Sequence, residues 1–218
     1  MGLLQRIEAR LSPIGVIGLG YVGLPLAMAA AEAGFIVHGV DSDETRVDRL
    51  KRGEHFPEGI DATLLIRLQE EGRLLIHDTT AALSSCEVIC ICVPTPLTRT
   101  REPDISCILE ASRAVSAALA GGSGERLVVL ESTSYPGTTR EVVLPHLMDS
   151  GRSLCHEFHL AFSPERIDPG NRRWTLKNTP KLVGGISGCC GELAAAFYSS
   201  FVERVVEVSS PETAEMAK

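Results

Sequence analysis

The chain has 218 residues, of which 44% are hydrophobic and 22% are charged, and its formal net charge is −7. This composition can fill a sizeable core, so it excludes wholesale disorder. No stretch is rich in lysine and arginine, so a nucleic-acid partner held through its phosphates is not expected. No apolar stretch reaches the ~18 residues of a membrane span, so no membrane partner is expected either.

The cysteines and the N-terminus indicate the compartment. The chain has seven cysteines, an odd number, and several lie inside apolar runs without the paired spacing of a zinc site. Buried thiols in a reducing cytoplasm therefore fit this pattern better than a disulfide framework. Met1 to Arg10 mixes charged and apolar residues, which predicts a short amphipathic helix and not a signal peptide.

From residue 13 onward, apolar runs alternate with helical patterns. The expected strands are Ile14–Ile17, Phe35–Val40, Leu74–Ile76, Glu87–Val93, Leu127–Leu130, Phe158–Phe162, Lys181–Val183 and Val205–Val208. The expected helices are Val22–Ala33, Glu44–Arg52, Ala62–Glu71, Ile105–Ala120, Thr138–Met148 and Cys190–Phe201. The strands lack period-2 alternation, so they are expected to be buried on both faces. This order predicts an α/β fold with a doubly wound parallel sheet between two helical layers (αβα).

The first turn carries the clearest chemistry. Residues 18–23 read Gly-Leu-Gly-Tyr-Val-Gly, a G-x-G-x-x-G pattern that follows a strand and opens a helix. Gly18 suits the tight turn, Gly20 lets a pyrophosphate approach the backbone, and Gly23 lets the helix pack close to the strand. The helix N-terminus then offers N–H groups to the phosphates. A glycine-rich turn without a ligand is the alternative.

An acidic residue at the end of the second strand favours the ligand. A carboxylate at Asp41 can accept both ribose hydroxyls and repels a 2′-phosphate, so the sequence predicts a Rossmann-type domain that binds NAD in preference to NADP. Arg46 lies close by and could hold a 2′-phosphate, cover the adenine or remain solvated.

Three further loops follow strands, at the edge where an open α/β sheet binds its ligand. Pro94 and Thr95 follow the fourth strand, where Thr95 could bond to the cofactor or the loop could simply be proline-rich. Ser132 and Thr133 follow the fifth strand, where hydroxyls could cap a helix or order a water beside the nicotinamide. Glu165 follows the sixth strand, although a loop glutamate is usually a solvated charge.

These segments resemble the UDP-sugar 6-dehydrogenases, part of the UDP-glucose/GDP-mannose dehydrogenase superfamily. The matching runs are GLGYVGLPLA (18–27), CVPTP (92–96), EST (131–133), SPE (163–165) and AEMAK (214–218). Within the family, residues 101–104 and 164–171 resemble the branch that acts on UDP-N-acetylglucosamine or UDP-N-acetylmannosamine. The UDP-glucose branch has a second acid after the Pro-Glu pair, which this chain lacks; UDP-glucose is kept as the alternative substrate.

The resemblance implies a double oxidation of the sugar C6 hydroxyl to a carboxylate, with two NAD. Tyr21 and Val22 would contact the pyrophosphate, and Asp41 and Arg46 the adenosine ribose. Thr133 would help order a water near the nicotinamide. Glu165 would act as general base or water activator, and Lys218 would stabilise the developing oxyanion.

The resemblance also implies a domain plan. Residues 1–12 would form an N-terminal helix or leader, residues 13–210 the NAD-binding domain, and residues 211–218 the start of the central helix. In the family an asparagine, the nucleophilic cysteine and a UDP-binding domain follow, and none lies within these 218 residues. The chain alone is therefore expected to bind NAD without turnover, and the longer protein is expected to be a homodimer or higher oligomer.

None of the cysteines present matches the family nucleophile. Cys189 and Cys190 begin a helix, where a thiolate could be stabilised, but buried structural thiols are the simpler interpretation. The histidines show no metal-ligand spacing, and His156 with His159 alone is weak, so no metal site is expected. Two alternative functions stay open: a stand-alone NAD-binding regulatory module, and a β-hydroxyacid-type dehydrogenase that needs neither Glu165 nor Lys218.

Overall fold

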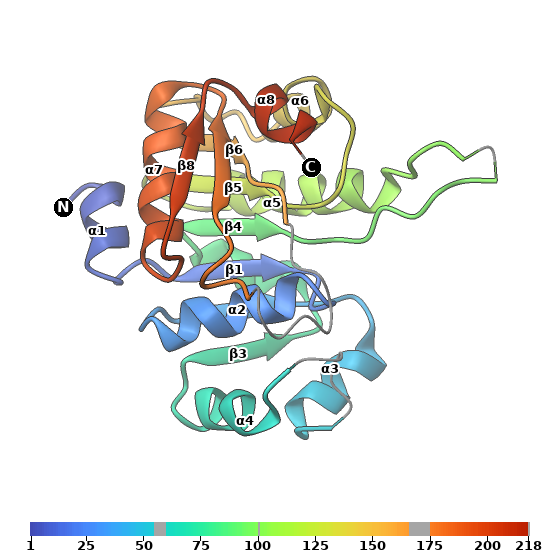
Figure 1. The fold of residues 1–218 in the computed structure, drawn as a ribbon, viewed down its shortest axis with the longest axis vertical. Helices are drawn as coiled ribbons and strands as arrows, with labels where there is room; N and C mark the ends of the chain where they lie inside the picture. The colour runs from blue at the N-terminus through green and yellow to red at the C-terminus, as the bar shows by residue number, and fades with distance from the viewer. Residues whose placement is uncertain (55–59, 100, 166–174, 218) are drawn as a thin grey trace.

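The computed structural model describes residues 1–54, 60–99, 101–165 and 175–217. Within these residues eight strands form one sheet. The strands are β1 (Ile14–Ile17), β2 (Val37–Val40), β3 (Leu74–His77), β4 (Val88–Ile91), β5 (Arg126–Leu130), β6 (Phe158–Phe162), β7 (Lys181–Gly185) and β8 (Val205–Val208). They lie side by side in the order β3-β2-β1-β4-β5-β6-β7-β8 (Figure 1). From β1 to β3 each new strand is added on one side of β1, and β4 is then added on the other side. A crevice is therefore expected between the ends of β1 and β4, where the order of addition changes.

Most of the sheet is parallel, as predicted. β1 pairs with β2 and β4, and the parallel pairing continues through β5 to β6. The prediction of a wholly parallel sheet is wrong at β7, which runs antiparallel to β6, while β8 is again parallel to β7. A parallel neighbour needs a crossover, usually a helix, and the described parts of the β6–β7 connection contain none.

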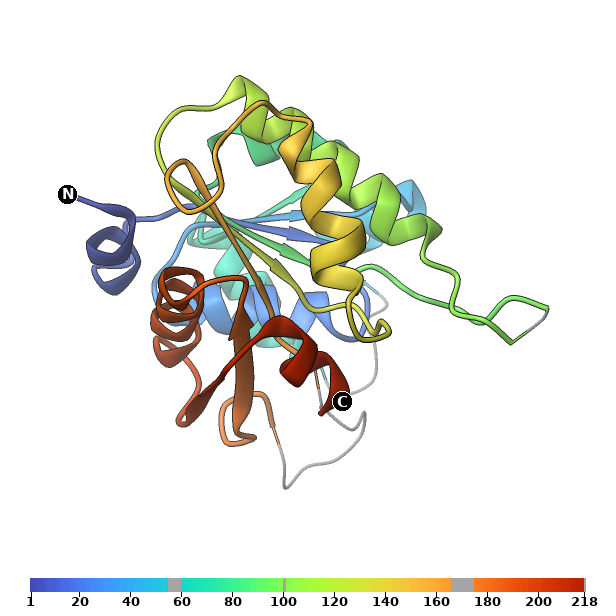
Figure 2. The same cartoon turned by 90° about the horizontal axis from the view of Figure 1, so that it is seen from above.

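The helices cover both faces of the sheet (Figure 2). One hydrophobic cluster takes residues from α1 (Leu3–Glu8), α2 (Gly23–Glu32), α3 (Glu44–Lys51), α4 (Ala62–Glu70) and α7 (Gly188–Ser199). A second cluster takes residues from the 3₁₀ helix η1 (Thr80–Ser85), α5 (Ser106–Gly121), the π-helical segment η2 (Thr138–Val143), α6 (Leu144–Met148) and α8 (Pro211–Met216). Among the helices of the described residues, none is both long enough and apolar enough to cross a bilayer.

The two hydrophobic clusters meet at the sheet. On β4, Val88 and Cys90 belong to the first cluster, and Ile89 and Ile91 belong to the second. All four are fully buried, which explains why apolar and polar residues do not alternate along this strand. The three-layer αβα arrangement predicted from the sequence is therefore confirmed.

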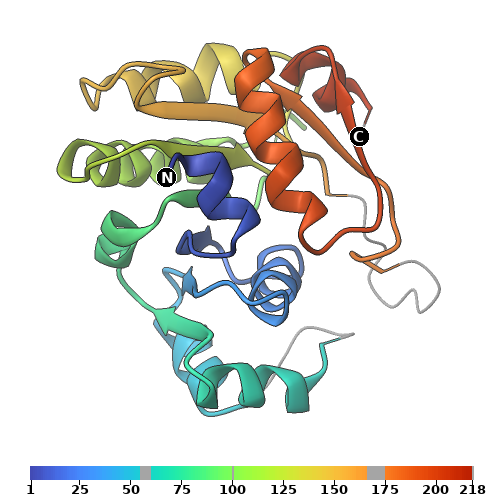
Figure 3. The same cartoon turned by 90° about the vertical axis from the view of Figure 1, so that its left-hand side faces the viewer.

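Local differences from the sequence prediction have physical causes. The predicted helix Thr138–Met148 divides into η2 and α6. Pro145 has no N–H to donate to an earlier turn, and a wider π-type turn accommodates the missing bond. The helix predicted within Met1–Arg10 is confirmed as α1, which packs against α7 (Figure 3).

Candidate functional site

The β1–α2 turn has the geometry expected of a phosphate-binding loop. Gly18 has φ +90°, and a Cβ atom there would lie 2.6 Å from the carbonyl oxygen of Cys92. A Cβ atom at Gly23 would lie 1.9 Å from the carbonyl oxygen of Gly18, so only glycine lets α2 start this close to β1. At Gly20 a Cβ atom would meet nothing within 4 Å. The backbone at Gly20 is therefore open to a ligand.

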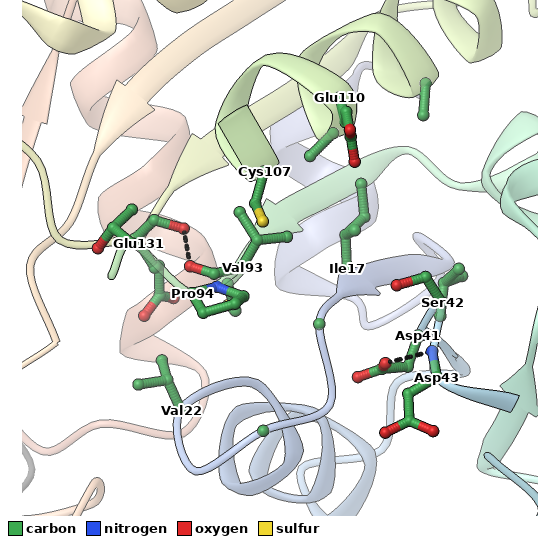
Figure 4. A pocket seen from close by; sticks show the side chains of 18 of the residues that line it. Ile17, Val22, Asp41, Ser42, Asp43, Val93, Pro94, Cys107, Glu110 and Glu131 are labelled. Carbon is green, nitrogen blue, oxygen red and sulfur yellow. Dashed lines mark hydrogen bonds between the residues drawn. The ribbon is translucent and has the colours of Figure 1, made fainter. Parts of the chain in front are cut away.

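A cavity of about 580 Å³ lies at this edge of the sheet, where β1, β2, β4 and β5 end (Figure 4). Every residue that the sequence assigned to the cofactor lines it except Gly23, which acts in packing. These lining residues are Gly18, Gly20, Tyr21, Val22, Asp41, Arg46, Pro94, Thr95, Ser132 and Thr133. Loops from four strands thus form a single candidate cofactor site.

Asp41, just after β2, is held in place before any ligand binds. Its carboxylate, 5% exposed, accepts hydrogen bonds from the backbone N–H groups of Leu19 (2.8 Å) and Asp43 (2.9 Å). One guanidinium nitrogen of Arg46 donates to both carboxylate oxygens, at 3.0 and 2.8 Å. The Arg46 side chain is 44% exposed, so a ribose hydroxyl can take its place at Asp41 while water solvates the guanidinium.

The loops after β4 and β5 are joined by a serine. The Ser132 hydroxyl donates a 2.8 Å hydrogen bond to the carbonyl oxygen of Val93, which fixes the two loops relative to each other (Figure 4). Ser132 itself is buried, and its neighbour Thr133 is exposed on the cavity wall. Ser132 therefore supports the wall, and Thr133 presents a free surface to a ligand.

Behind the cavity lies a buried cluster of charged groups. The Lys181 ammonium on β7 donates to Glu131 and to Glu165, each at 2.8 Å. The hydroxyl of Tyr198 on α7 donates to the second oxygen of Glu131. All four side chains are buried, and Glu131 also lines the cavity. Glu165 does not line the cavity but is connected to it through Lys181 and Glu131.

Burial and charge control the protonation of this cluster. Burial alone lowers the pKa of Lys181, but the attraction of the two carboxylates outweighs it, so the pKa is raised and the ammonium stays charged. The pKa of Glu131 is raised, because burial and the repulsion of Glu165 exceed the attraction of Lys181. Burial, and then Glu131, raise the pKa of Tyr198, which stays protonated as a donor.

A second buried carboxylate fixes α8 beside the loop that follows β5. Glu215 accepts hydrogen bonds from the N–H groups of Gly137 (2.6 Å) and Thr139 (2.9 Å) and from the Thr139 hydroxyl (2.7 Å). Nearby, Arg140 and Glu212 form an ion pair at 2.6 Å. α8 is thus tied to the segment that follows Thr133.

Lys218 lies outside the described residues, as do residues 166–171 of the run that suggested the substrate branch.

Sequence reasoning missed part of this site. Glu131 opens the Ser-Thr loop, but nothing in its neighbours indicates that it is buried. Lys181 begins an apolar strand, and a lysine at a strand start is usually solvated, so only the folded arrangement reveals its two partners. Asp78 and Glu110 also line the cavity and add negative charge. With Asp41 they oppose a 2′-phosphate, in agreement with NAD as the cofactor.

Comparison with known proteins identifies the family. Residues 12–202 match the NAD binding domain of the UDP-glucose/GDP-mannose dehydrogenase family. The chain is 33% identical to the UDP-N-acetyl-D-mannosamine dehydrogenase of Methanococcus aeolicus, over 100% of this chain and 48% of the relative. It is 34% identical to the UDP-N-acetyl-D-glucosamine 6-dehydrogenase of Salmonella typhi, over 94% of this chain and 47% of the relative.

A solved structure agrees with the sequence relatives. The UDP-D-ManNAc dehydrogenase of Pyrococcus horikoshii superposes with a TM-score of 0.86 at 33% identity, over 94% of this chain and 49% of that one. The chain spans about half the length of the curated relatives it matches. The resemblance drawn from the sequence motifs is confirmed, and the chain belongs to the UDP-glucose/GDP-mannose dehydrogenase family, of which it carries the NAD-binding domain.

Proposed function

We propose that this chain is the cofactor half of a cytoplasmic, NAD-dependent UDP-sugar 6-dehydrogenase. The reaction would oxidise the C6 hydroxyl of a UDP-N-acetylhexosamine to the carboxylate with two NAD. The observation that carries the proposal is the gathering of the cofactor residues, with Asp41 among them, around one acidic cavity. The relatives named for UDP-N-acetyl-D-mannosamine and UDP-N-acetyl-D-glucosamine support this substrate class.

The described residues fit NAD, which when bound accepts a hydride from the substrate. Asp41 would bind the adenosine ribose hydroxyls, with Arg46 displaced toward the adenine. The open backbone at Gly20, with Tyr21 and Val22, would receive the pyrophosphate beside the start of α2. Pro94, Thr95 and Ser132 would form the wall on the nicotinamide side.

Thr133 and Glu165 would act on water and protons. Thr133, exposed on the cavity wall, would order a water. Glu165 would accept a proton from water in the hydrolysis of a thioester formed on the nucleophilic cysteine of the longer protein. Lys181 would orient Glu165, since its ammonium lies 2.8 Å from that carboxylate. Lys218 would stabilise the oxyanion electrostatically. The substrate would need a further UDP-binding half, and the longer protein would be a homodimer or higher oligomer.

Two experiments test the proposal. Calorimetric titration of the 218-residue chain should show NAD⁺ and NADH binding, and weaker NADP⁺ binding. A longer protein that contains a UDP-binding half should then produce NADH with UDP-N-acetylglucosamine or UDP-N-acetylmannosamine, and little with UDP-glucose. Preference for UDP-glucose would contradict the substrate branch, and NADH production by the 218 residues alone would contradict the requirement for a second half. If Glu165→Gln in the longer protein changes neither NAD⁺ binding nor NADH production, a β-hydroxyacid-type enzyme would be favoured.

A further inference from the structure

A cluster of soft metal-binding atoms lies away from the cofactor cavity. Cys155 precedes β6, His159 is the second residue of β6, and Cys189 and Cys190 lie in the first turn of α7. β6 starts at the edge of the sheet opposite to the cavity, and α7 covers that part of the molecule (Figure 1). The three sulfur atoms lie within 4.8 Å of one another. Residues 30 and more positions apart thus converge on one point.

The distances suit a tetrahedral ion. Zinc bound by four ligands, with Zn–S near 2.3 Å and Zn–N near 2.0–2.1 Å, separates two sulfurs by about 3.8 Å and a sulfur from a nitrogen by about 3.5 Å. The Sγ atoms of Cys155 and Cys190 are 3.9 Å apart. The Nδ1 atom of His159 lies 3.8 Å from the Sγ atoms of both Cys189 and Cys190. These three pairs therefore lie within a few tenths of an ångström of the expected spacing. The His159 ring is not among the atoms that all lie within 4.8 Å of one another, so it would also have to move toward Cys155 when the ion binds.

A serine hydroxyl marks the point of convergence. The Ser187 Oγ atom lies 3.1 Å from the Sγ atoms of Cys155, Cys189 and Cys190. A hydroxyl carries one hydrogen and can donate it to only one of these sulfurs. The remaining contacts bring together sulfur atoms that are weak donors and weak acceptors. A cation placed among them would replace these weak contacts with strong bonds to thiolates.

Other interpretations explain less of this geometry. A disulfide between Cys155 and Cys190 would use two of the sulfurs and leave Cys189 and the His159 ring without a role. Simple core packing would not need Cys189, which is exposed. An imidazole nitrogen facing the thiols is the combination that a Cys₃His zinc site requires. None of these residues shows a recognisable metal spacing in the sequence, which is why no metal site was expected there.

We propose that Cys155, Cys189, Cys190 and His159 bind one zinc ion, apart from the cofactor cavity. Each thiol that binds the ion releases its proton to solvent, because the thiolate is the ligand. The ion would join the loop before β6 to the first turn of α7. This proposal does not rest on the dehydrogenase function, because no cavity residue takes part in it.

Cobalt binding tests the site directly. The reduced chain, stripped of metal with a chelator and titrated with Co²⁺, should develop thiolate-to-cobalt charge-transfer absorption and tetrahedral d–d bands, saturating at one equivalent. Zn²⁺ should then displace cobalt and abolish both. Cys189→Ser, at an exposed position, should remove most of the charge-transfer intensity and weaken zinc binding by about 100-fold or more, since one of the four ligands is lost.

Controls separate metal binding from damage to the fold. Cys107→Ser, which changes a partly exposed cysteine outside the cluster, should leave the cobalt spectrum unchanged. NAD⁺ affinity should be unchanged in Cys189→Ser, which shows that the variant is folded. Equal cobalt absorption in the parent chain and in Cys189→Ser and His159→Asn would overturn the proposal. Recovery of a Cys155–Cys190 disulfide instead of zinc, from reduced protein supplied with the metal, would overturn it as well.

Discussion

Two clusters of carboxylates and basic groups border the cofactor cavity, and they differ in burial. Asp41 pairs with Arg46, five residues further along the chain, and the Arg46 side chain is 44% exposed. Lys181 pairs with Glu131 and Glu165, which are 50 and 16 residues away, and no side chain of this cluster is more than 5% exposed. The first cluster can exchange partners with a ligand, and the second cannot.

The difference follows from solvation. Water solvates the Arg46 guanidinium when it leaves Asp41, so exchanging this partner for a ligand costs little free energy, as for other exposed ion pairs. Separating Lys181 from its carboxylates would leave charges in a medium that solvates them poorly. The exposed pair therefore suits binding, and the buried cluster suits holding Glu165 and the base of the Glu131 loop in a fixed arrangement.

The largest expected effect comes from breaking the buried cluster. Lys181→Met keeps an unbranched apolar stem one atom shorter than lysine and removes the ammonium from Glu131 and Glu165. We expect it to lower the free energy of unfolding by about 3–5 kcal/mol, the usual cost of removing one partner from a buried pair. Urea denaturation followed by circular dichroism measures it. Lys177→Met, at an exposed lysine nearby, should change the value by less than about 0.5 kcal/mol. Equal effects of the two variants would contradict the buried pair.

The exposed pair should act on affinity instead. Asp41→Asn weakens the hydrogen bonds to the ribose hydroxyls, and charge-assisted bonds of this kind contribute about 1.5–3 kcal/mol, or roughly 10- to 150-fold in Kd. Calorimetric titration with NAD⁺ measures the change. Asp43→Asn, which keeps a capping side chain at the start of α3, is the matched control and should bind NAD⁺ nearly as the parent does. If Asp43→Asn loses more NAD⁺ affinity than Asp41→Asn, the assignment of the ribose contact to Asp41 is wrong.

The same contrast determines what the sequence could predict. Asp41, the glycines and the hydroxyl loop occupy fixed places in strand–turn–helix units, so local patterns were enough to bring them to one edge of the sheet. Lys181 and Tyr198 come from later elements, and their contacts with Glu131 depend on how β7 and α7 pack. The direction of β7 was mispredicted for the same reason, because an apolar strand has the same pattern in either direction. The cysteine cluster is likewise assembled from separate elements.

A smaller effect should appear in the pH dependence of stability. The pKa of Glu131 is raised, chiefly by burial, so the folded chain holds this proton at a pH where the unfolded chain, with a pKa near 4.3, has lost it. Across that window, from about pH 4.3 upward to the folded pKa, the free energy of unfolding therefore falls as pH rises. Glu131→Gln keeps one acceptor oxygen for Lys181, presents an NH₂ group that can donate to the Tyr198 hydroxyl oxygen, and has no proton to exchange. Urea denaturation at several pH values should show a smaller fall in this variant, and an unchanged slope would contradict the assignment.

The smallest effect is expected at the ion pair between Arg140 and Glu212, whose side chains are 45% and 34% exposed. The pKa of Glu212 is lowered to about 2, mainly by its hydrogen bond from Arg140, so the pair contributes above the unfolded pKa and is lost as pH falls toward 2. A double-mutant cycle of Arg140→Gln and Glu212→Gln should give a coupling of about 0.5 kcal/mol at neutral pH, because solvent screens the charges. Glu203→Gln combined with Arg140→Gln should show no coupling. The pair's 2.6 Å contact is shorter than either contact of Lys181, so a coupling as large as the Lys181→Met effect would mean that distance, and not burial, decides what an ion pair contributes here.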